Sequence, residues 1–164
     1  MSNISMTTSK RNAIVTVMLI SAFVSMLNQT ILNTALPAII KGLNITETTA
    51  QWLITGFMLV NGIMIPLTAF LMDKYSTRHL YIFSMAIFLL GSIVAAFSPT
   101  FSILMISRII QAIGAGILLP LMQFTVFTLF PAEQRGFAMG LAGVVVQSAP
   151  AIGPTLTGLF VDLF

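Results

Sequence analysis

The chain has 164 residues, of which 57% are hydrophobic and only 7% are charged, and its formal net charge is +3. Because soluble domains carry about 25% charged residues, so few charges exclude a water-facing surface without large apolar patches. The absence of cysteine excludes disulfides and thiolate metal sites, and the small, scattered basic excess does not suit a nucleic-acid partner. We therefore expect an all-α, polytopic transmembrane helix bundle with membrane lipid as its solvent.

A membrane-spanning helix needs about 20 mostly apolar residues, and the charged residues divide this chain into segments of that length. About five spans are expected, over residues 13–40, 49–72, 80–97, 101–130 and 137–161. Residues 1–12 are expected to form a cytoplasmic N-terminus, and residues 13–164 a single transmembrane domain. The first uncharged stretch is longer than the core of about 7–15 residues in a cleaved signal, so we expect a retained helix.

The second half of the first span is polar. Gln29 and Asn33 stand four residues apart and Thr30 stands three residues before Asn33, which places these side chains on neighbouring positions of a helix surface. Amides and hydroxyls in a membrane either bond across helices or line a wet cavity. The residues leave both interpretations open: a transport pathway lined by Gln29 and Asn33, or structural contacts between helices.

Two short charged loops follow the second and fourth spans. Asp73, Lys74 and Arg78 lie in the first loop, and Glu133 and Arg135 lie in the second. One interpretation is a salt-bridged latch that holds helix ends together at the cytoplasmic face. The other is a pair of solvated turns whose charges only set the topology.

The distribution of basic residues indicates the orientation of the bundle. If the N-terminus is cytoplasmic, only Lys41 lies on the opposite side, and the cytoplasmic side carries Lys10, Arg11, Lys74, Arg78 and Arg135. Because loops rich in lysine and arginine stay in the cytoplasm, this asymmetry favours a cytoplasmic N-terminus.

The fourth span contains a charged residue inside an apolar segment. Arg108 is followed by Gln111 and Gly114 at steps of three, so the three residues share a helix face. A charge within a membrane costs at least about 2.5–3.5 kcal/mol on insertion scales and is normally turned inward. Arg108 and Gln111 are therefore candidates for a transport pathway, and an arginine that extends toward the interface is the alternative.

The fifth span is rich in proline and small residues, with Pro150, Gly153, Pro154 and Gly158 in one short segment. Each proline removes a helix hydrogen bond, and small residues allow close helix approach. We expect a packed, kinked helix in a moving bundle, against the alternative of a passive kink. No phosphate loop, dinucleotide turn, Cys/His cluster or pair of catalytic carboxylates is found, so no enzymatic activity, cofactor or metal site is expected.

Four segments resemble, in order and spacing, the signature motifs of the major facilitator superfamily, within the EmrB/QacA type of fourteen-span drug–proton antiporters. They are residues 28–37, 69–78, 108–116 and 149–158, and residues 58–66 resemble the lincomycin-resistance (LmrB-like) branch of Gram-positive bacteria. The chain departs from the motif pattern where Asn28 replaces a frequent aspartate and where Ala69, Ser76 and Ala149 replace glycines.

The resemblance implies a role for individual residues. Arg108 would face the central cavity and serve proton coupling. Asp73 and Arg78 would stabilise the outward-facing arrangement, and Gly153 and Pro154 would let the fifth helix bend and seal against leakage. Since an amide does not titrate, no proton-carrying role follows for Asn28.

The function implied is that of the N-terminal portion of a proton-coupled multidrug efflux transporter. It would export amphipathic drugs across the plasma membrane of a Gram-positive bacterium, together with missing C-terminal helices. Because such transporters rock two six-helix halves around a midplane site, five spans form only part of the N-terminal half and are not expected to transport alone. The alternative is a non-transporting truncated membrane protein that assembles with, or interferes with, full-length transporters.

Overall fold

The computed structural model describes the backbone of residues 7–163, and the side chains of the same range except residues 156 and 159–163. The described chain forms five helices: α1 (Thr8–Leu43), α2 (Glu47–Lys74), α3 (Thr77–Ala96), α4 (Phe101–Leu129) and α5 (Ala132–Leu163). All five are long and apolar enough to cross a membrane. The expectation of an all-α bundle of about five spans is confirmed.

α2 and α3 begin shortly before the expected spans because Thr46 and Ser76 cap them, whereas α4 begins at the expected Phe101. α1 also begins early, at Thr8, but its N-cap Thr7 makes no side-chain cap hydrogen bond. The side chains of Thr46, Ser76 and Thr100 accept hydrogen bonds from the backbone N–H three residues later, which stabilises the first turns of α2, α3 and α4. At the other end of α1, Asn44 adopts a left-handed conformation (φ 51°) and ends the helix. Charge alone places the starts of α2 and α3 too late because their capping residues are polar but uncharged.

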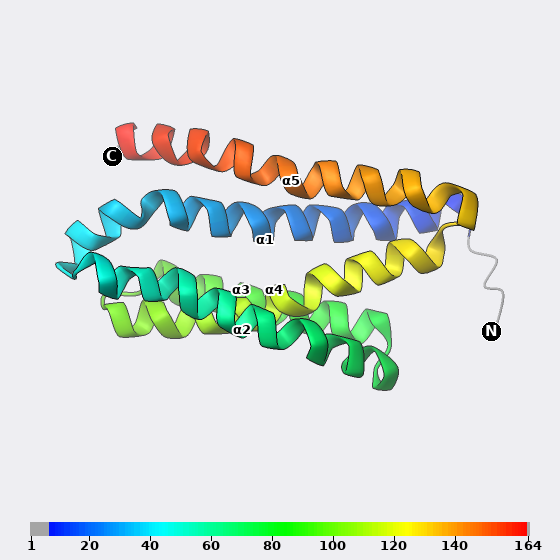
Figure 1. Ribbon diagram of the computed structural model, residues 1–164, viewed down its shortest axis with the longest axis horizontal. Coiled ribbons are helices and arrows are strands. Elements are labelled where there is room, and N and C mark those ends of the chain that lie inside the picture. Colours follow the sequence, from blue (N-terminus) through cyan, green and yellow to red (C-terminus); the bar gives the residue numbers. More distant parts are fainter. Residues whose placement is uncertain (1–6, 164) are drawn as a thin grey trace.

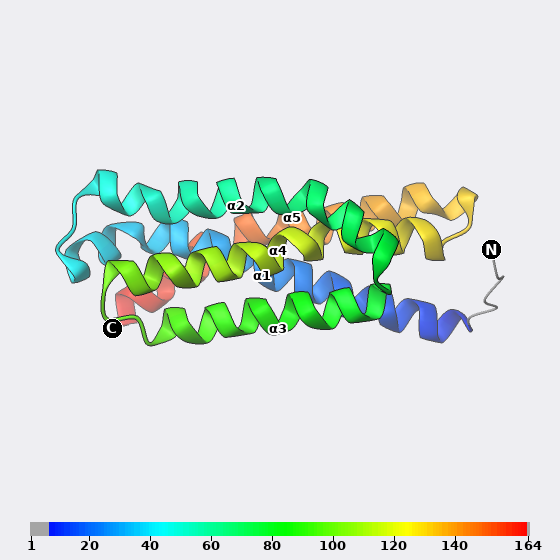
Figure 2. The ribbon, with the colours of Figure 1, turned by 90° about the horizontal axis from the view of Figure 1, so that it is seen from below.

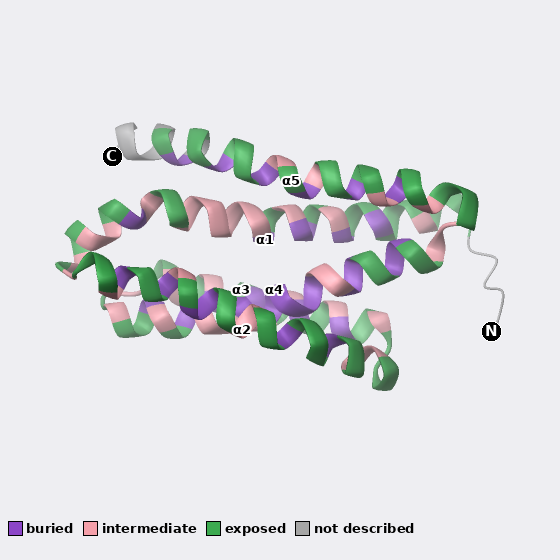
Figure 3. Cartoon of the chain, viewed as in Figure 1, coloured by how far each residue is buried: buried purple, intermediate pink, exposed green. Residues whose placement is uncertain are grey.

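The bundle has two layers (Figure 1). In one layer α1 and α5 lie side by side, and in the other α2 and α3 pack against α4. The view from below shows α4 running between α3 and the other helices (Figure 2). In the most apolar window of α4, 56% of the residues are buried, against 22–28% in the other helices, so α4 is the central element (Figure 3). Any functional group on its buried face therefore meets several helices at once.

Successive helices alternate in direction, so the loops gather at two ends (Figure 1). The start of α1, the α2–α3 loop and the α4–α5 loop share one end, and this end carries the basic residues of the expected cytoplasmic side. Lys41 lies near the end of α1, at the opposite end of the bundle. The fold thus separates the charges as the positive-inside interpretation requires.

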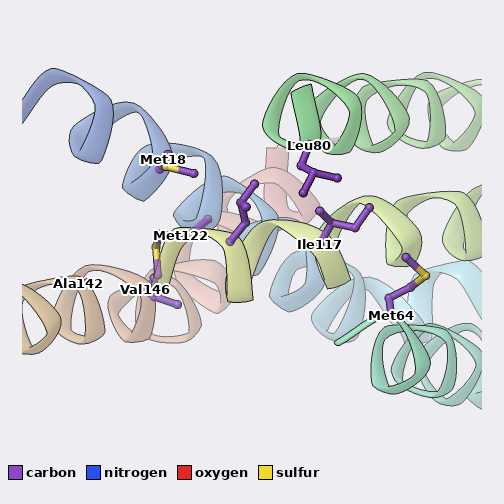
Figure 4. Close-up of a cluster of buried hydrophobic side chains, with 9 residues drawn as sticks. Met18, Met64, Leu80, Ile117, Met122, Ala142 and Val146 are labelled. Carbon is purple, nitrogen blue, oxygen red and sulfur yellow. The ribbon is translucent and has the colours of Figure 1, made fainter. Parts of the chain in front are cut away.

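One cluster of buried apolar side chains joins all five helices (Figure 4). Met18 comes from α1, Met64 from α2 and Leu80 from α3, and they meet Ile117 and Met122 of α4; the remaining members are Ala22, Leu121, Ala142 and Val146. Most other large apolar side chains, such as Met58 and Ile63 at 60% exposed each, point away from the bundle. A surface with so many exposed apolar side chains suits lipid rather than water.

Two glycines of α4 let its neighbours approach closely. A Cβ on Gly114 would lie 2.6 Å from Ser84 O of α3, and a Cβ on Gly116 would lie 2.5 Å from Met64 Cβ of α2. These contacts explain why small residues follow Arg108 on the same helix, since membrane helices pack through small side chains.

The α2–α4 contact also satisfies a carbonyl that a proline leaves free. Pro120 lies inside α4 and has no N–H, so Gly116 O loses its helical donor. The Thr68 hydroxyl of α2 is fully buried and lies 3.2 Å from Gly116 O and 2.7 Å from Met64 O. The single hydroxyl hydrogen of Thr68 is shared between these two carbonyls, so Thr68 compensates in part for the missing N–H, as side chains do for prolines inside membrane helices.

Candidate functional site

The central feature of the site is the Arg108 side chain, which is 1% exposed and turned into the bundle. Its Nη1 donates to Gln111 Oε1 at 2.8 Å, one turn along α4, and to Asn28 Oδ1 of α1 at 3.2 Å. The guanidinium therefore connects the two layers of the bundle, from about two turns inside α4 to the middle part of α1. The alternative interpretation, an arginine that extends to the membrane interface, does not fit this geometry.

A third helix joins the arrangement through Gln111. Its Nε2 donates to Ser92 Oγ of α3 at 3.0 Å, so Gln111 accepts from Arg108 and donates to Ser92. Gly91 makes this approach possible, because a Cβ there would lie 2.7 Å from Gln111 Cγ and 2.8 Å from its N. The chain of bonds from Asn28 through Arg108 and Gln111 to Ser92 fixes the Gln111 amide in one orientation.

An aromatic ring of α2 completes the surroundings of the guanidinium. Arg108 Cζ lies 4.3 Å from the centroid of the Phe57 ring, which is 2% exposed, and this cation–π contact partly replaces the lost hydration. Arg108 Nε and Nη2 are buried with no hydrogen-bond partner among the described residues. All oxygens bonded to Arg108 belong to neutral amides, so the site keeps a net positive charge in the membrane.

The other two expected pathway residues lie outside this network. Gln29 is half-buried and Asn33 is exposed, and the hydrogen bonds of the described residues do not join either of them to Arg108. Between them, the Thr30 side chain faces α5, where its Cγ2 would lie 2.5 Å from a Cβ on Gly153. This part of α1 therefore makes one helix contact through Thr30, and the pathway role of Gln29 and Asn33 stays a prediction.

The residues of the expected latch all lie at the end of the bundle that carries the start of α1 (Figure 1). Lys74 Nζ lies 4.4 Å from the Phe70 ring centroid, within its own helix. Arg135 Nε donates to Phe130 O at 3.1 Å, and its guanidinium lies over the Phe127 ring. Both cations thus have aromatic partners here, and the salt-bridged latch with Asp73, Arg78 and Glu133 stays a prediction.

The proline-rich segment of α5 is continuous helix through Pro150 and Pro154. Its small residues do not all serve packing. Ala149 and Gly153 are buried against α1, whereas a Cβ on Gly158 would meet no described atom within 4 Å. The bending of α5 stays a prediction, since the structure shows one arrangement.

Sequence reasoning did not include Asn28, Ser92 and Phe57 among the site residues. Asn28 was signalled only as a departure from the motif, and its 80-residue separation from Arg108 gives no local pattern. Ser92 and Phe57 look like ordinary helix residues, because periodicity shows which face a residue occupies but not which helix packs against it.

Comparisons with known proteins agree with this arrangement of helices. The family model described as Major Facilitator Superfamily matches residues 18–164. The Bacillus subtilis (strain 168) protein "Uncharacterized MFS-type transporter YcnB" is 54% identical to this chain, and the matched region covers 94% of this chain and 33% of that protein.

Two further relatives carry functional names. The lincomycin resistance protein LmrB of Bacillus subtilis (strain 168) is 46% identical, with 88% of this chain and 30% of that protein covered. The probable multidrug resistance protein EmrY of Escherichia coli (strain K12) is 35% identical, with 88% and 28% covered. The chain thus spans about a third of the length of the curated relatives it matches.

Proposed function

The chain belongs to the major facilitator superfamily of membrane transporters, and from this membership we propose that it is the N-terminal portion of a proton-coupled multidrug efflux transporter. Its substrates would be amphipathic drugs, exported across the plasma membrane of a Gram-positive bacterium with the N-terminus in the cytoplasm. The relatives named for lincomycin and multidrug resistance support this substrate class, and the Bacillus relatives support the source.

The observation that carries the proposal is the buried Arg108 between α1 and α4. An intramembrane charge is a functional-site hypothesis by default, because its burial is costly. Here the charge is held by two amides and an aromatic ring from three helices, and two of its nitrogens have no hydrogen-bond partner in the part of the chain that the structure describes. The role that we assign to this guanidinium is to respond when a proton or a substrate charge enters the transport pathway.

We propose that further helices, equivalent to the rest of the relatives' length, complete the transporter. An apolar cavity of about 560 Å³ opens between α1, α3 and α4, and Ile14, Tyr81 and Phe124 are among its lining residues. A continuous apolar cavity of this size on a membrane protein suits an additional helix. The same face favours the second candidate function, in which the chain assembles with full-length transporters and interferes with them.

The latch and the fifth helix would act during the conformational change. We propose that Asp73 and Arg78 stabilise the outward-facing arrangement through cytoplasmic contacts that involve Glu133 and Arg135. Gly153 and Pro154 would allow α5 to bend against α1, where Gly153 already lies beside Thr30.

The test uses the chain alone and a completed transporter. The completed form fuses this chain in frame to the part of Bacillus subtilis LmrB that follows the matched segment. We expect the fusion to raise lincomycin resistance in a sensitive strain and a protonophore to remove the effect, while the chain alone gives neither. Proton-driven drug efflux from vesicles that contain only the chain would overturn the proposal that it is a portion of a transporter.

Two substitutions in the fusion test the central residue. Arg108→Ala removes the buried charge and is expected to abolish resistance, whereas Lys41→Ala removes an exposed charge at the opposite end and serves as the control. Unchanged resistance in Arg108→Ala would remove Arg108 from the mechanism. Co-expression of the chain with intact LmrB tests the second function, which requires a drop in resistance.

A further inference from the structure

The cavity between α1, α3 and α4 lies at one end of the bundle and does not run along its length. Its lining residues fall within residues 13–18 of α1, 77–81 of α3 and 124–129 of α4. These segments belong to the start of α1, the start of α3 and the end of α4, which share one end of the bundle (Figure 1). Six helical residues rise about 9 Å, whereas the hydrocarbon core of a bilayer is about 30 Å thick. The cavity is therefore at the depth where acyl chains meet their headgroups.

The wall of this cavity is apolar and its mouth is basic. Ile14 and Phe124 are among the apolar residues of the wall. Arg78 is the charged lining residue; it lies in the first turn of α3, and its side chain is exposed. One turn further into α3, the Tyr81 hydroxyl shares a hydrogen bond of 2.5 Å with Ser21 Oγ, which joins α3 to α1 at the inner end of the cavity.

The end of the bundle around the cavity carries an excess of positive charge. Its basic residues outnumber its acidic ones; they are Lys10, Arg11, Lys74, Arg78 and Arg135, against Asp73 and Glu133. Arg11 Cζ lies 4.4 Å from the centroid of the Phe130 ring, so this guanidinium is held beside the end of α4. Clustered lysine and arginine at a membrane surface attract anionic headgroups, and an anionic partner is therefore favoured at this mouth.

An anionic phospholipid matches both parts of the cavity, whereas other occupants match one part. A spanning helix would cover the apolar wall but would bring mostly apolar side chains to a cationic mouth. A water-soluble anion would pair with Arg78 and leave the apolar wall empty. At about 560 Å³ the cavity is several times larger than the about 150 Å³ that holds benzene, so it has room for part of an acyl chain.

We propose that this cavity binds one anionic phospholipid, with an acyl chain against the apolar wall and the headgroup phosphate paired with Arg78. The site prefers anionic to zwitterionic lipids, because the cation of a zwitterionic headgroup is repelled by the basic residues of the same end. The inference goes beyond the proposed function, since it concerns this chain in a bilayer and requires neither transport nor one orientation. Further helices would pack beside the lipid at this end.

The chain allows a tryptophan reporter to be placed in the cavity. Its single tryptophan, Trp52, lies near the start of α2 at the opposite end of the bundle, and Trp52→Phe removes this signal. In that background, Ile14→Trp places the reporter in the cavity wall. Phe137→Trp is the matched control, because Phe137 is an exposed residue near the start of α5, at the same end, and is not among the lining residues.

The purified 164-residue variants are reconstituted in phosphatidylcholine vesicles that contain increasing fractions of a lipid with brominated acyl chains, either phosphatidylglycerol or phosphatidylcholine. Quenching of each reporter gives the binding constant of phosphatidylglycerol relative to phosphatidylcholine. One basic residue near a membrane surface favours an anionic lipid by about fivefold in the binding constant. We therefore expect the relative binding constant at Ile14→Trp to exceed that at Phe137→Trp by about fivefold.

Substitutions at the basic end test the role of Arg78. Arg78→Gln should remove the difference between the two reporters, and Arg78→Lys should retain it because the charge remains. Lys74→Gln neutralises another cation of the same end, which lies over the Phe70 ring of its own helix and does not line the cavity. This control should change the difference by less than about twofold, since it alters the surface charge but not the site. Arg78 and Lys74 are both exposed, so neither change disturbs the buried clusters.

Three results would overturn the proposal. Equal relative binding constants at the two reporters would show that the surface potential alone attracts the anionic lipid. A preference that survives Arg78→Gln would remove this residue from the site. Quenching of Ile14→Trp by neither lipid would show that protein, such as a second copy of the chain, covers the cavity. Because the assay measures lipid binding by the chain, a fusion that fails to export drug would refute the proposed function and leave this result standing.

Discussion

The hydrogen bonds of Arg108 predict how strongly Gln111 and Asn28 are each coupled to it in the stability of the fold. The perturbation is a pair of double-mutant cycles, Arg108→Met with Gln111→Leu and Arg108→Met with Asn28→Leu. Methionine keeps an unbranched stem and removes the guanidinium with its charge, so the Arg108 variant leaves no buried unpaired ion. Each cycle isolates the coupling between two residues, so the loss of the Ser92 bond in the Gln111 variant cancels.

The magnitudes follow from the two distances. Arg108 Nη1 lies 2.8 Å from Gln111 Oε1 and 3.2 Å from Asn28 Oδ1. Hydrogen bonds to charged groups contribute about 1.5–3 kcal/mol to stability, and the stronger ones have N···O distances of about 2.7–2.9 Å. We therefore expect a coupling of about 2–3 kcal/mol for Gln111 and about 1–1.5 kcal/mol for Asn28.

The assay is equilibrium unfolding of the purified chain from mild-detergent micelles by added SDS, followed by circular dichroism. The free energy of unfolding is compared among the parent, three single variants and two double variants. A coupling for Asn28 that equals or exceeds that of Gln111 would refute the geometric reasoning. Couplings below about 0.5 kcal/mol at both partners would show that these bonds do not hold the guanidinium.

Three further predictions test the packing and the orientation. Gly114→Ala places a Cβ 2.6 Å from a carbonyl oxygen of α3 and should lower the free energy of unfolding by about 1–3 kcal/mol. The control, Gly140→Ala, has open space around its Cβ and should leave the free energy of unfolding unchanged or raise it by up to about 1 kcal/mol. Equal effects of the two substitutions would contradict the close packing of α4 on α3. Thr68→Val removes the hydroxyl that donates to Gly116 O and should lower the free energy of unfolding by about 1–3 kcal/mol, whereas Thr68→Ser keeps the hydroxyl. The same unfolding assay compares the two variants, and equal stability would refute this role of Thr68. Ser9→Cys should react with an impermeant maleimide only in permeabilised cells and Gly42→Cys in intact cells, and the reverse pattern would invert the topology.

The number and order of the helices were predictable because charge is so scarce in this chain. Each break between spans is marked by charge or by a proline, such as Asp73 and Lys74 at the end of α2 and Pro99 before α4. The ends were less predictable. Thr46 and Ser76 begin their helices through hydroxyl bonds to the backbone, and the same residue types also occur inside spans, as Thr68 does.

For the site, the sequence showed which residues share a face but not which helix that face meets. The step of three from Arg108 to Gln111 is a local property, and the structure joins these residues at 2.8 Å. The partners Asn28 and Phe57 come from other helices, and their positions depend on how α1 and α2 pack on α4. Pairing across helices is set by tertiary packing, which a single sequence with no alignment does not encode in any local pattern.

The amide at Asn28 has a consequence for coupling to protons. A carboxylate at this position would neutralise Arg108 and exchange that partnership for a proton, whereas an amide accepts the same hydrogen bond and cannot titrate. Glu47 and Asp73 lie at the two ends of α2, and Glu133 lies at the start of α5, so these three carboxylates are far along the chain from the middle of their helices. If the proposed proton coupling holds, we expect the intramembrane proton carrier to lie outside α1–α4, with Arg108 as the fixed charge that this carrier faces. Asn28→Asp in the fusion with LmrB would then add a second titrating group beside the guanidinium, and we expect it to shift the pH dependence of efflux; an unchanged pH profile would show that Arg108 and the proton carrier do not interact.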